Sequence, residues 1–268
     1  MSTIITWVAV VVGAYGAAIA AFLTIFYLMP IAGRRWSPRA KRLRAFLWEW
    51  SAAVATQWLL LIPLLWWPWW YKKGRGRPII LVHGYGQTSI DFMALAFRLR
   101  HELHRPVWAF DYWFFSAPDR CAARLARFVE RVRRQNEAAE VDLVCHSYGG
   151  IVSRYLVERI DASPVRNLVM VATPHRGTWW AKLGPGRSSH AMSPNNVFVA
   201  EFWPPSPPES VSYYGVRSEA DAVVAPPNNA GLENAGTELV MTDRGHLGLL
   251  FSKRVASQIA KWLENDPC

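Results

Sequence analysis

The chain has 268 residues, of which 51% are hydrophobic and 19% charged, and its formal net charge is +10. Residues 1–77 hold ten basic residues and one acidic residue, Glu49, whereas residues 78–268 hold twenty basic and nineteen acidic residues. Because the larger part is close to neutral, the net charge excludes an extended nucleic-acid-binding surface there. Three widely spaced cysteines, Cys121, Cys145 and Cys268, predict neither a disulfide framework nor a metal site.

The N-terminal part of the chain has the composition of a membrane region. Residues 2–33 carry no charged side chain, and residues 4–31 are long enough to cross a bilayer as one helix. A cleaved signal peptide is the alternative, but such peptides begin with basic residues and have a shorter apolar core. After a basic loop at 33–44, the tryptophan-rich stretch at 46–71 is expected to form a second span or an interfacial helix.

The basic residues near these stretches give opposing indications of orientation. The loop at residues 34–44 holds six basic residues and would stay cytoplasmic, which sends the C-terminal domain outward in a hairpin. Residues 72–77 hold four basic residues and favour the opposite side. By six against four, we expect the domain to face outward.

Beyond this linker, apolar runs alternate with amphipathic stretches. The expected strands are residues 78–82, 107–110, 141–145, 165–172, 212–217 and 237–241, and the expected helices are 90–104, 119–134, 148–161 and 249–263. Strands that are apolar on both faces and alternate with helices predict an α/β fold, with a mostly parallel central sheet covered by helices on both faces.

Two domains are therefore predicted, a membrane region at residues 1–73 and an α/β domain at 74–268. Within the second, residues 178–209 match no regular element and are rich in Pro, Ser and Trp. An irregular segment of this length in a compact domain is expected to form a lid or a pocket wall.

The stretch CHSYGG places Ser147 between an expected strand and an expected helix. This is typical of G-x-S-x-G, the sharp turn that lifts a serine hydroxyl above a parallel sheet. Gly149 matches the motif, whereas Cys145 stands where the motif has glycine. Because chemistry gathers at the carboxyl ends of parallel strands, Ser147 is a candidate nucleophile, with an ordinary loop serine as the alternative.

A serine nucleophile needs a base, usually a histidine that a carboxylate orients. His246 lies between the last expected strand and the last expected helix, where a loop can carry it over the sheet. His175 directly follows a strand and could brace the site, and His190 lies in the irregular segment. His246 is therefore the predicted base, against the alternative of a surface-loop or helix-capping histidine.

The remaining catalytic groups are assigned from the loops that follow strands. Asp221 follows the expected strand at 212–217 and is the predicted partner of the histidine, with Glu219 and Asp243 as alternatives. Backbone N–H groups of Tyr148 and Tyr85 are the predicted oxyanion donors, because one follows the nucleophile and the other lies in the glycine-containing loop HGYGQ. That loop can also be read as a tight turn, which needs the same glycines.

Three groups of segments resemble one family: ILVHGYGQ, then VDLVCHSYGGIVSRYL with VATPHRGT, and finally SEADAVVAP with RGHLGLLFSKRV. They are similar to the small bacterial triacylglycerol lipases and related esterases of the α/β-hydrolase superfamily, over residues 78–264. The resemblance implies carboxylic-ester hydrolysis through an acyl-enzyme, without a metal or organic cofactor. It assigns Ser147, His246 and Asp221 as the triad and Tyr85 and Tyr148 as oxyanion donors.

The sequence as a whole predicts a membrane-anchored serine ester hydrolase. Lipases and esterases are the expected classes, and phospholipases and lysophospholipases are among them. Trp179, Trp180 and Trp203 either line a substrate pocket or cap the core. An amidase, thioesterase or acyltransferase on the same triad, and a non-catalytic binding protein, remain alternatives. For a bacterial chain, residues 4–71 would bind the inner membrane, with the catalytic domain on the periplasmic side. Residues 1–72 are expected to be dispensable for turnover of soluble esters.

Overall fold

The computed structural model describes residues 46–51, 76–194 and 196–264, and four single helical positions at residues 10, 13, 17 and 21. Its centre is a six-stranded parallel sheet with the order β2-β1-β3-β4-β5-β6. The strands are β1 (Ile79–Val82), β2 (Val107–Phe110), β3 (Val141–His146), β4 (Val165–Val171), β5 (Ser212–Ser218) and β6 (Thr237–Met241). The predicted parallel sheet is confirmed.

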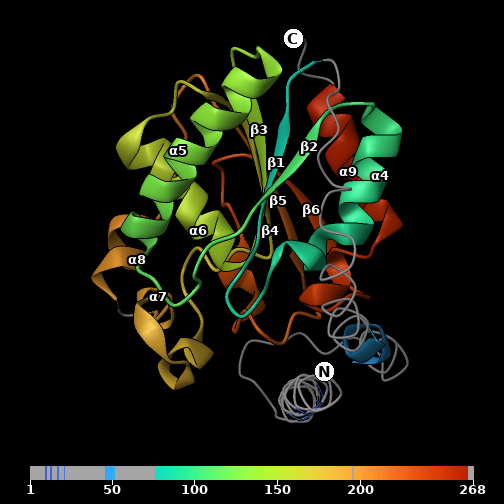
Figure 1. Cartoon of the computed structure of the whole chain (residues 1–268). Coiled ribbons are helices and arrows are strands. Elements are labelled where there is room, and N and C mark those ends of the chain that lie inside the picture. Colours follow the sequence, from blue (N-terminus) through green and yellow to red (C-terminus); the bar gives the residue numbers. More distant parts are fainter. Residues whose placement is uncertain are drawn as a thin grey trace.

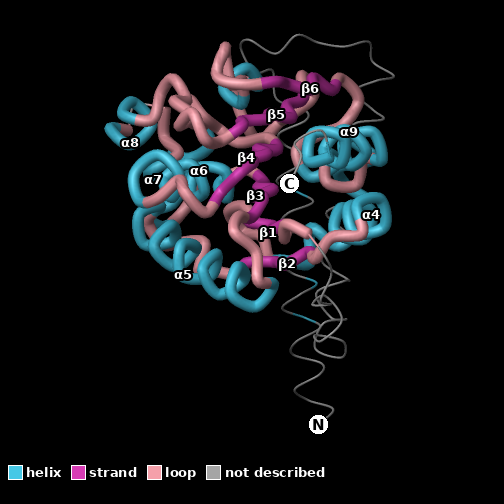
Figure 2. Tube along the Cα trace, turned by 90° about the horizontal axis from the view of Figure 1, so that it is seen from above, coloured by secondary structure: helices cyan, strands magenta, loops and turns pink. Residues whose placement is uncertain are grey.

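Two layers of helices enclose this sheet. Helices α5 (Pro118–Asn136) and α6 (Tyr148–Tyr155) cover one face, and α4 (Met93–Leu103) and α9 (Lys253–Glu264) cover the other (Figures 1 and 2). The buried residues divide accordingly into one apolar cluster on each side of the sheet. The result is the three-layer α/β architecture that the alternation of strands and helices predicted.

The pleat of β1 explains why its sequence shows no polar alternation. Ile80 and Val82 belong to the cluster beneath α5 and α6, whereas Ile79 and Leu81 belong to the cluster beneath α4 and α9. Successive side chains of a strand point to opposite faces, and here both faces are covered, so all four are buried.

Residues 178–209 contain more regular structure than the sequence predicts. They form a 3₁₀ helix at Trp179–Leu183 and two short helices, α7 (Gly186–Ala191) and α8 (Val197–Glu201). The Asn196 side chain caps α8 by accepting a hydrogen bond from the Phe198 N–H at 2.8 Å. The prediction that this segment fits no element was wrong, because helices of one or two turns are too short to show a hydrophobic period.

Helix boundaries differ from the expected ones near the ends of the elements. The last helix was expected from about residue 249, but Leu247–Leu249 is a 3₁₀ turn and α9 begins at Lys253. The Val255 N–H donates to the Ser252 hydroxyl at 3.4 Å, which caps the helix at this point. The helix that begins at Tyr148 continues past α6 as a π-helical turn, Leu156–Ile160, close to its expected end.

The predicted membrane region lies largely outside the described residues. Of the expected span at 4–31 only single positions are described, and of the stretch at 46–71 only residues 46–51, which are helical. Within the described parts of the chain, no helix combines the length and the apolarity that a membrane crossing requires. Membrane attachment therefore stays a prediction.

Candidate active site

Ser147 occupies a strained turn at the carboxyl end of β3. Its backbone has φ 53° and ψ −123°, a conformation that residues with a side chain rarely adopt. The Ser147 N–H donates to the Val171 carbonyl at 2.8 Å, which ties the turn to the end of β4. The residue as a whole is 7% exposed, so it is largely shielded from solvent.

Close packing on both sides of Ser147 explains the small residues of the motif. A Cβ added to Gly149 would lie 2.3 Å from the Val82 carbonyl oxygen, and one added to Gly84 would lie 2.9 Å from the Ser147 Cβ. Cys145 points instead into the core, where its thiol donates to the Ser153 hydroxyl at 2.9 Å. Burial raises the pKa of the Cys145 thiol to about 12, so the thiol stays protonated and serves as a small core residue.

Asp221 and His246 form a buried, hydrogen-bonded pair in the site. His246 Nδ1 lies 2.8 Å from Asp221 Oδ2, and the other carboxylate oxygen accepts the N–H groups of Val223 and Val224 at 2.7 and 2.9 Å. Burial lowers the pKa of His246, but the Asp221 carboxylate and Glu49 outweigh it and leave the pKa raised above 6.5. The paired carboxylate thus fixes the ring and favours its protonated form.

His146 connects this pair to the turn that carries Ser147. Its Nε2 lies 3.1 Å from the His246 carbonyl oxygen, its Nδ1 lies 2.7 Å from Gln87 Oε1, and its ring centre is 4.6 Å from that of His246. Burial lowers the pKa of His146 well below the usual range, so the ring is neutral and has one proton to donate. His246 is therefore seated directly beside the residue that precedes Ser147.

The loop of the predicted oxyanion donor Tyr85 lies against the nucleophile turn. The Gly84 N–H donates to Gln87 Oε1 at 2.8 Å, and the Tyr112 hydroxyl donates to the His83 carbonyl at 2.6 Å, which fixes the loop. Tyr148 begins α6, and its hydroxyl donates to the Ser116 carbonyl at 2.7 Å. The Tyr85 hydroxyl donates to the Pro185 carbonyl at 2.9 Å, so the side chains of Tyr85 and Tyr148 are both engaged elsewhere. The backbone N–H groups of these two residues remain the predicted oxyanion donors.

The alternative residues lie in other surroundings. His175 is buried with its Nδ1 3.2 Å from an Arg154 nitrogen, and His190 is an exposed residue of α7. Asp243 pairs with Arg244 at 2.8 Å. The Glu219 N–H donates to the Met241 carbonyl, which extends the hydrogen bonding between β5 and β6 by one residue. Of the three predicted acids, Asp221 is the one that contacts His246.

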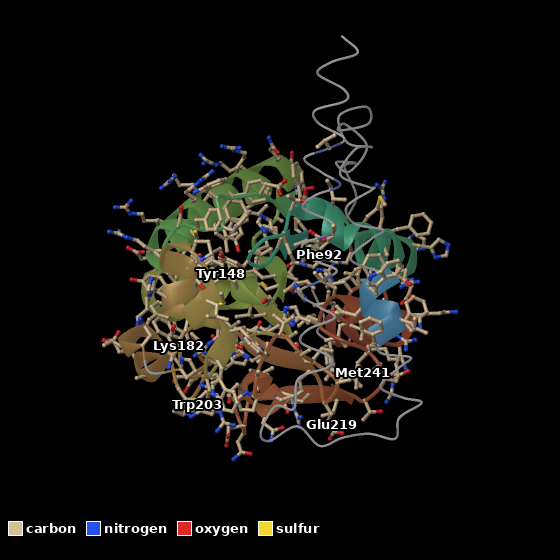
Figure 3. The ribbon with its side chains drawn as sticks, turned by 90° about the horizontal axis from the view of Figure 1, so that it is seen from below. Phe92, Tyr148, Lys182, Trp203, Glu219 and Met241 are labelled. Atoms are coloured by element: carbon tan, nitrogen blue, oxygen red, sulfur yellow. The ribbon has the colours of Figure 1, made fainter. Side chains whose placement is uncertain are left out.

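The three predicted substrate-binding tryptophans divide into two groups. Trp179 and Trp203 border an open groove of about 340 Å³, and the Arg176 guanidinium lies 4.7 Å from the centre of the Trp203 ring. Trp180 is not part of this lining, and its indole N–H donates to the Ala222 carbonyl at 3.1 Å, next to Asp221. Seen from below, Lys182 and Trp203 both lie on the side of the short helices, opposite Met241 (Figure 3).

Sequence reasoning missed three residues of this site: Glu49, Gln87 and His146. Glu49 is the most distant in sequence, and its buried carboxylate accepts the N–H groups of Leu247 and Gly248. Its isolation as the one acid among the first 77 residues was the available signal, because a lone charge in an apolar stretch needs a partner.

Comparisons with known proteins agree with this architecture. A family model described as a domain of unknown function, DUF7379, matches residues 67–184. The mature form of a lipase from Bacillus licheniformis is 17% identical, with a TM-score of 0.61 over 70% of this chain and 91% of that one. Lipase B from Aspergillus fumigatus is 16% identical, with a TM-score of 0.62 over 74% of this chain and 55% of that one.

A third similar structure is a metagenomic carboxyl esterase, 17% identical, with a TM-score of 0.55 over 72% of this chain and 76% of that one. At such identities the likeness concerns the arrangement of the backbone. It shows that the α/β part of this chain has the fold of the α/β-hydrolases.

Proposed function

We propose that the protein is a serine ester hydrolase that cleaves acyl esters. The observation that carries this proposal is the hydrogen-bonded Asp221–His246 pair, set beside a strained turn that presents Ser147. Structural likeness to lipases and an esterase supports an ester as the substrate.

The chemistry follows from these groups. The Ser147 oxygen attacks the ester carbonyl carbon while the free ring nitrogen of His246 takes the hydroxyl proton. The C–O bond to the alcohol then breaks, and the imidazolium returns its proton to the leaving alkoxide. Water, deprotonated by the same ring, then attacks the acyl carbon. The bond to the Ser147 oxygen breaks, the imidazolium returns its proton to that oxygen, and the carboxylic acid is released. Asp221 stabilises the imidazolium in both steps, and the N–H groups of Tyr85 and Tyr148 stabilise the oxyanion.

The substrate class belongs to the same proposal. The groove bordered by Trp179 and Trp203 has a mainly apolar lining that suits an acyl chain, and Arg176, which also lines it, suits a polar or anionic head group. Attachment through residues 4–71, with the domain on the periplasmic side of a bacterial inner membrane, would hold the site near lipid substrates. Lipids and lysolipids are therefore the substrates to test first.

Active-site labelling tests the reaction class. A fluorophosphonate probe should label the full-length protein in detergent, and Ser147→Ala should abolish labelling, because the probe needs an activated serine. Ser153→Ala, which alters a buried serine of α6, is the matched control. A well-folded protein that resists the probe would point to the non-catalytic binding protein. A series of p-nitrophenyl esters of increasing chain length, with phospholipid and triglyceride substrates, then defines specificity.

A further inference from the structure

The helical segment at residues 46–51 reaches the loop that carries the predicted catalytic base. Glu49 is 1% exposed, and its Oε1 accepts the Leu247 N–H at 2.7 Å while its Oε2 accepts the Gly248 N–H at 2.8 Å. These amides directly follow His246 and open the 3₁₀ turn Leu247–Leu249. Both carboxylate oxygens are therefore committed to the two residues after the histidine, across almost two hundred positions of sequence.

The loop is shaped to receive this carboxylate. A Cβ added to Gly248 would lie 3.2 Å from Glu49 Oε2, so glycine leaves room for the close approach. A second contact lies on the same helix, because the Arg244 guanidinium is 4.7 Å from the centre of the Trp48 ring. Two adjacent residues of one segment thus contact both ends of the stretch from Arg244 to Gly248.

The attachment of residues 46–51 does not depend on burying their apolar side chains. Leu47 and Trp50 are exposed by 51% and 43%, whereas Glu49 is buried. This reverses the usual pattern of an amphipathic helix, in which charged side chains face solvent. A lone carboxylate is buried at high cost unless it is hydrogen-bonded, so the inward position of Glu49 indicates a specific role.

We propose that Glu49 is a positioning residue for His246, which makes the N-terminal segment part of the support of the active site. The inference rests on the proposed function of His246 as the base. Asp221 holds the Nδ1 side of the ring, and Glu49 holds the backbone that follows it. His246 is thereby held at its ring and at the backbone that follows it, by two carboxylates that lie far apart in the sequence.

Glu49 also acts on the charge of His246. Burial raises the pKa of Glu49 to about 7, against the lowering effects of His246 and of the two backbone N–H groups. Its ionised form raises the pKa of His246 and so stabilises the imidazolium. The other titratable groups here are Asp221, which is bonded to the ring, neutral His146, whose ring centre is 4.6 Å from that of His246, and Arg244. The Arg244 side chain would lie 3.7 Å from a Cβ added to Gly248. Loss of Glu49 should therefore lower the pKa of the base.

The test compares Glu49→Gln with Glu130→Gln in the full-length protein in detergent. Glu130 lies on α5, where its exposed side chain pairs with Arg133 at 2.7 Å, far in sequence from the catalytic loop. The readouts are kcat and KM on a soluble p-nitrophenyl ester, the pH profile of kcat/KM, and hydrogen exchange at the Leu247 and Gly248 amides.

In Glu49→Gln, kcat should fall by about 10²-fold with little change in KM. The fall should be smaller than in a variant that lacks His246, because the imidazole is still present but is held less precisely near Ser147. The acid limb of kcat/KM should move to lower pH, and the two amides should exchange faster. Glu49→Asp, which keeps the charge on a shorter side chain, should restore the position of the acid limb and part of kcat. Glu130→Gln should match the wild type in every readout.

Three results would decide against the proposal. First, if the Leu247 and Gly248 amides of Glu49→Gln exchange faster while kcat and the acid limb of kcat/KM stay as in the wild type, Glu49 only caps the 3₁₀ turn. Unchanged exchange at both amides would show that Glu49 does not hold the loop. Absence of turnover by the wild type would overturn the proposed function and the role of His246, while the exchange rates would still report on the contact itself.

Discussion

His246 Nδ1 lies 2.8 Å from Asp221 Oδ2, and the Asp221 carboxylate is held in turn by the N–H groups of Val223 and Val224. We expect His246→Ala to lower kcat on a soluble ester by about 10⁴-fold or more, because the serine then lacks its base. Asp221→Asn should have a comparable effect, since the amide cannot stabilise the imidazolium. Steady-state kinetics with folding checked by circular dichroism measures both.

Asp243→Asn is the matched control for the acid. Asp243 lies three residues before His246 on the same loop, and its carboxylate pairs with Arg244 at 2.8 Å. Its substitution should leave kcat within about twofold, because a partly exposed ion pair contributes little. Retention of a tenth of the activity in His246→Ala would mean that another residue is the base.

The pH dependence follows from the raised pKa of His246. The base must be neutral to accept the serine proton, so kcat/KM should fall as the pH drops through this pKa. Because Asp221 and Glu49 raise it, the midpoint of the acid limb should lie above the ordinary histidine value of 6.5. A limb below that value would contradict the electrostatic influence of the two carboxylates.

Gly149→Ala tests the close contact between the nucleophile turn and β1. The added methyl group would lie 2.3 Å from the Val82 carbonyl oxygen, which belongs to a buried strand and cannot move aside. We expect a loss of about 3 kcal/mol or more in the free energy of unfolding, measured by denaturant titration. In Gly231→Ala the nearest atom would be 3.2 Å away, so the loss should be clearly smaller.

Trp203→Ala tests the groove as an acyl-binding site. If the Trp203 ring contacts the acyl chain, KM for a long-chain ester should rise by about tenfold, while KM for an acetate ester stays unchanged. Trp180→Phe should behave differently, because its indole N–H donates to the Ala222 carbonyl beside Asp221. That substitution should lower kcat for both esters alike. Equal effects of Trp203→Ala on short and long esters would mean that the groove does not hold the chain.

Truncation separates membrane attachment from the support of His246. Deletion of residues 1–45 keeps Glu49 and should preserve turnover of a soluble ester while reducing action on vesicles. Deletion of residues 1–51 removes Glu49 and should lower kcat about 10²-fold, as in Glu49→Gln. This expectation replaces the one drawn from sequence, in which all of residues 1–72 were dispensable. If both truncations turned over the soluble ester at the same rate, residues 46–51 would be dispensable for catalysis, as the sequence predicts.

Local sequence determined the sheet and the turn at Ser147. Runs such as IILV in β1 are apolar at every position, which suits a strand buried on both faces, and the small residues around Ser147 satisfy a steric demand between neighbouring elements. The order of the loops after β5 and β6 was enough to select Asp221 and His246, because parallel strands bring their carboxyl ends to one edge.

Only the tertiary structure decided which distant groups complete the site. The bond between Glu49 and Leu247 joins residues 198 positions apart, and no periodicity or spacing encodes such a contact. The short helices between Trp179 and Glu201 were likewise invisible, since their stability comes from packing and capping rather than from a repeating pattern. Local patterns specify elements, whereas the partner of a buried charge depends on how the whole chain closes around it.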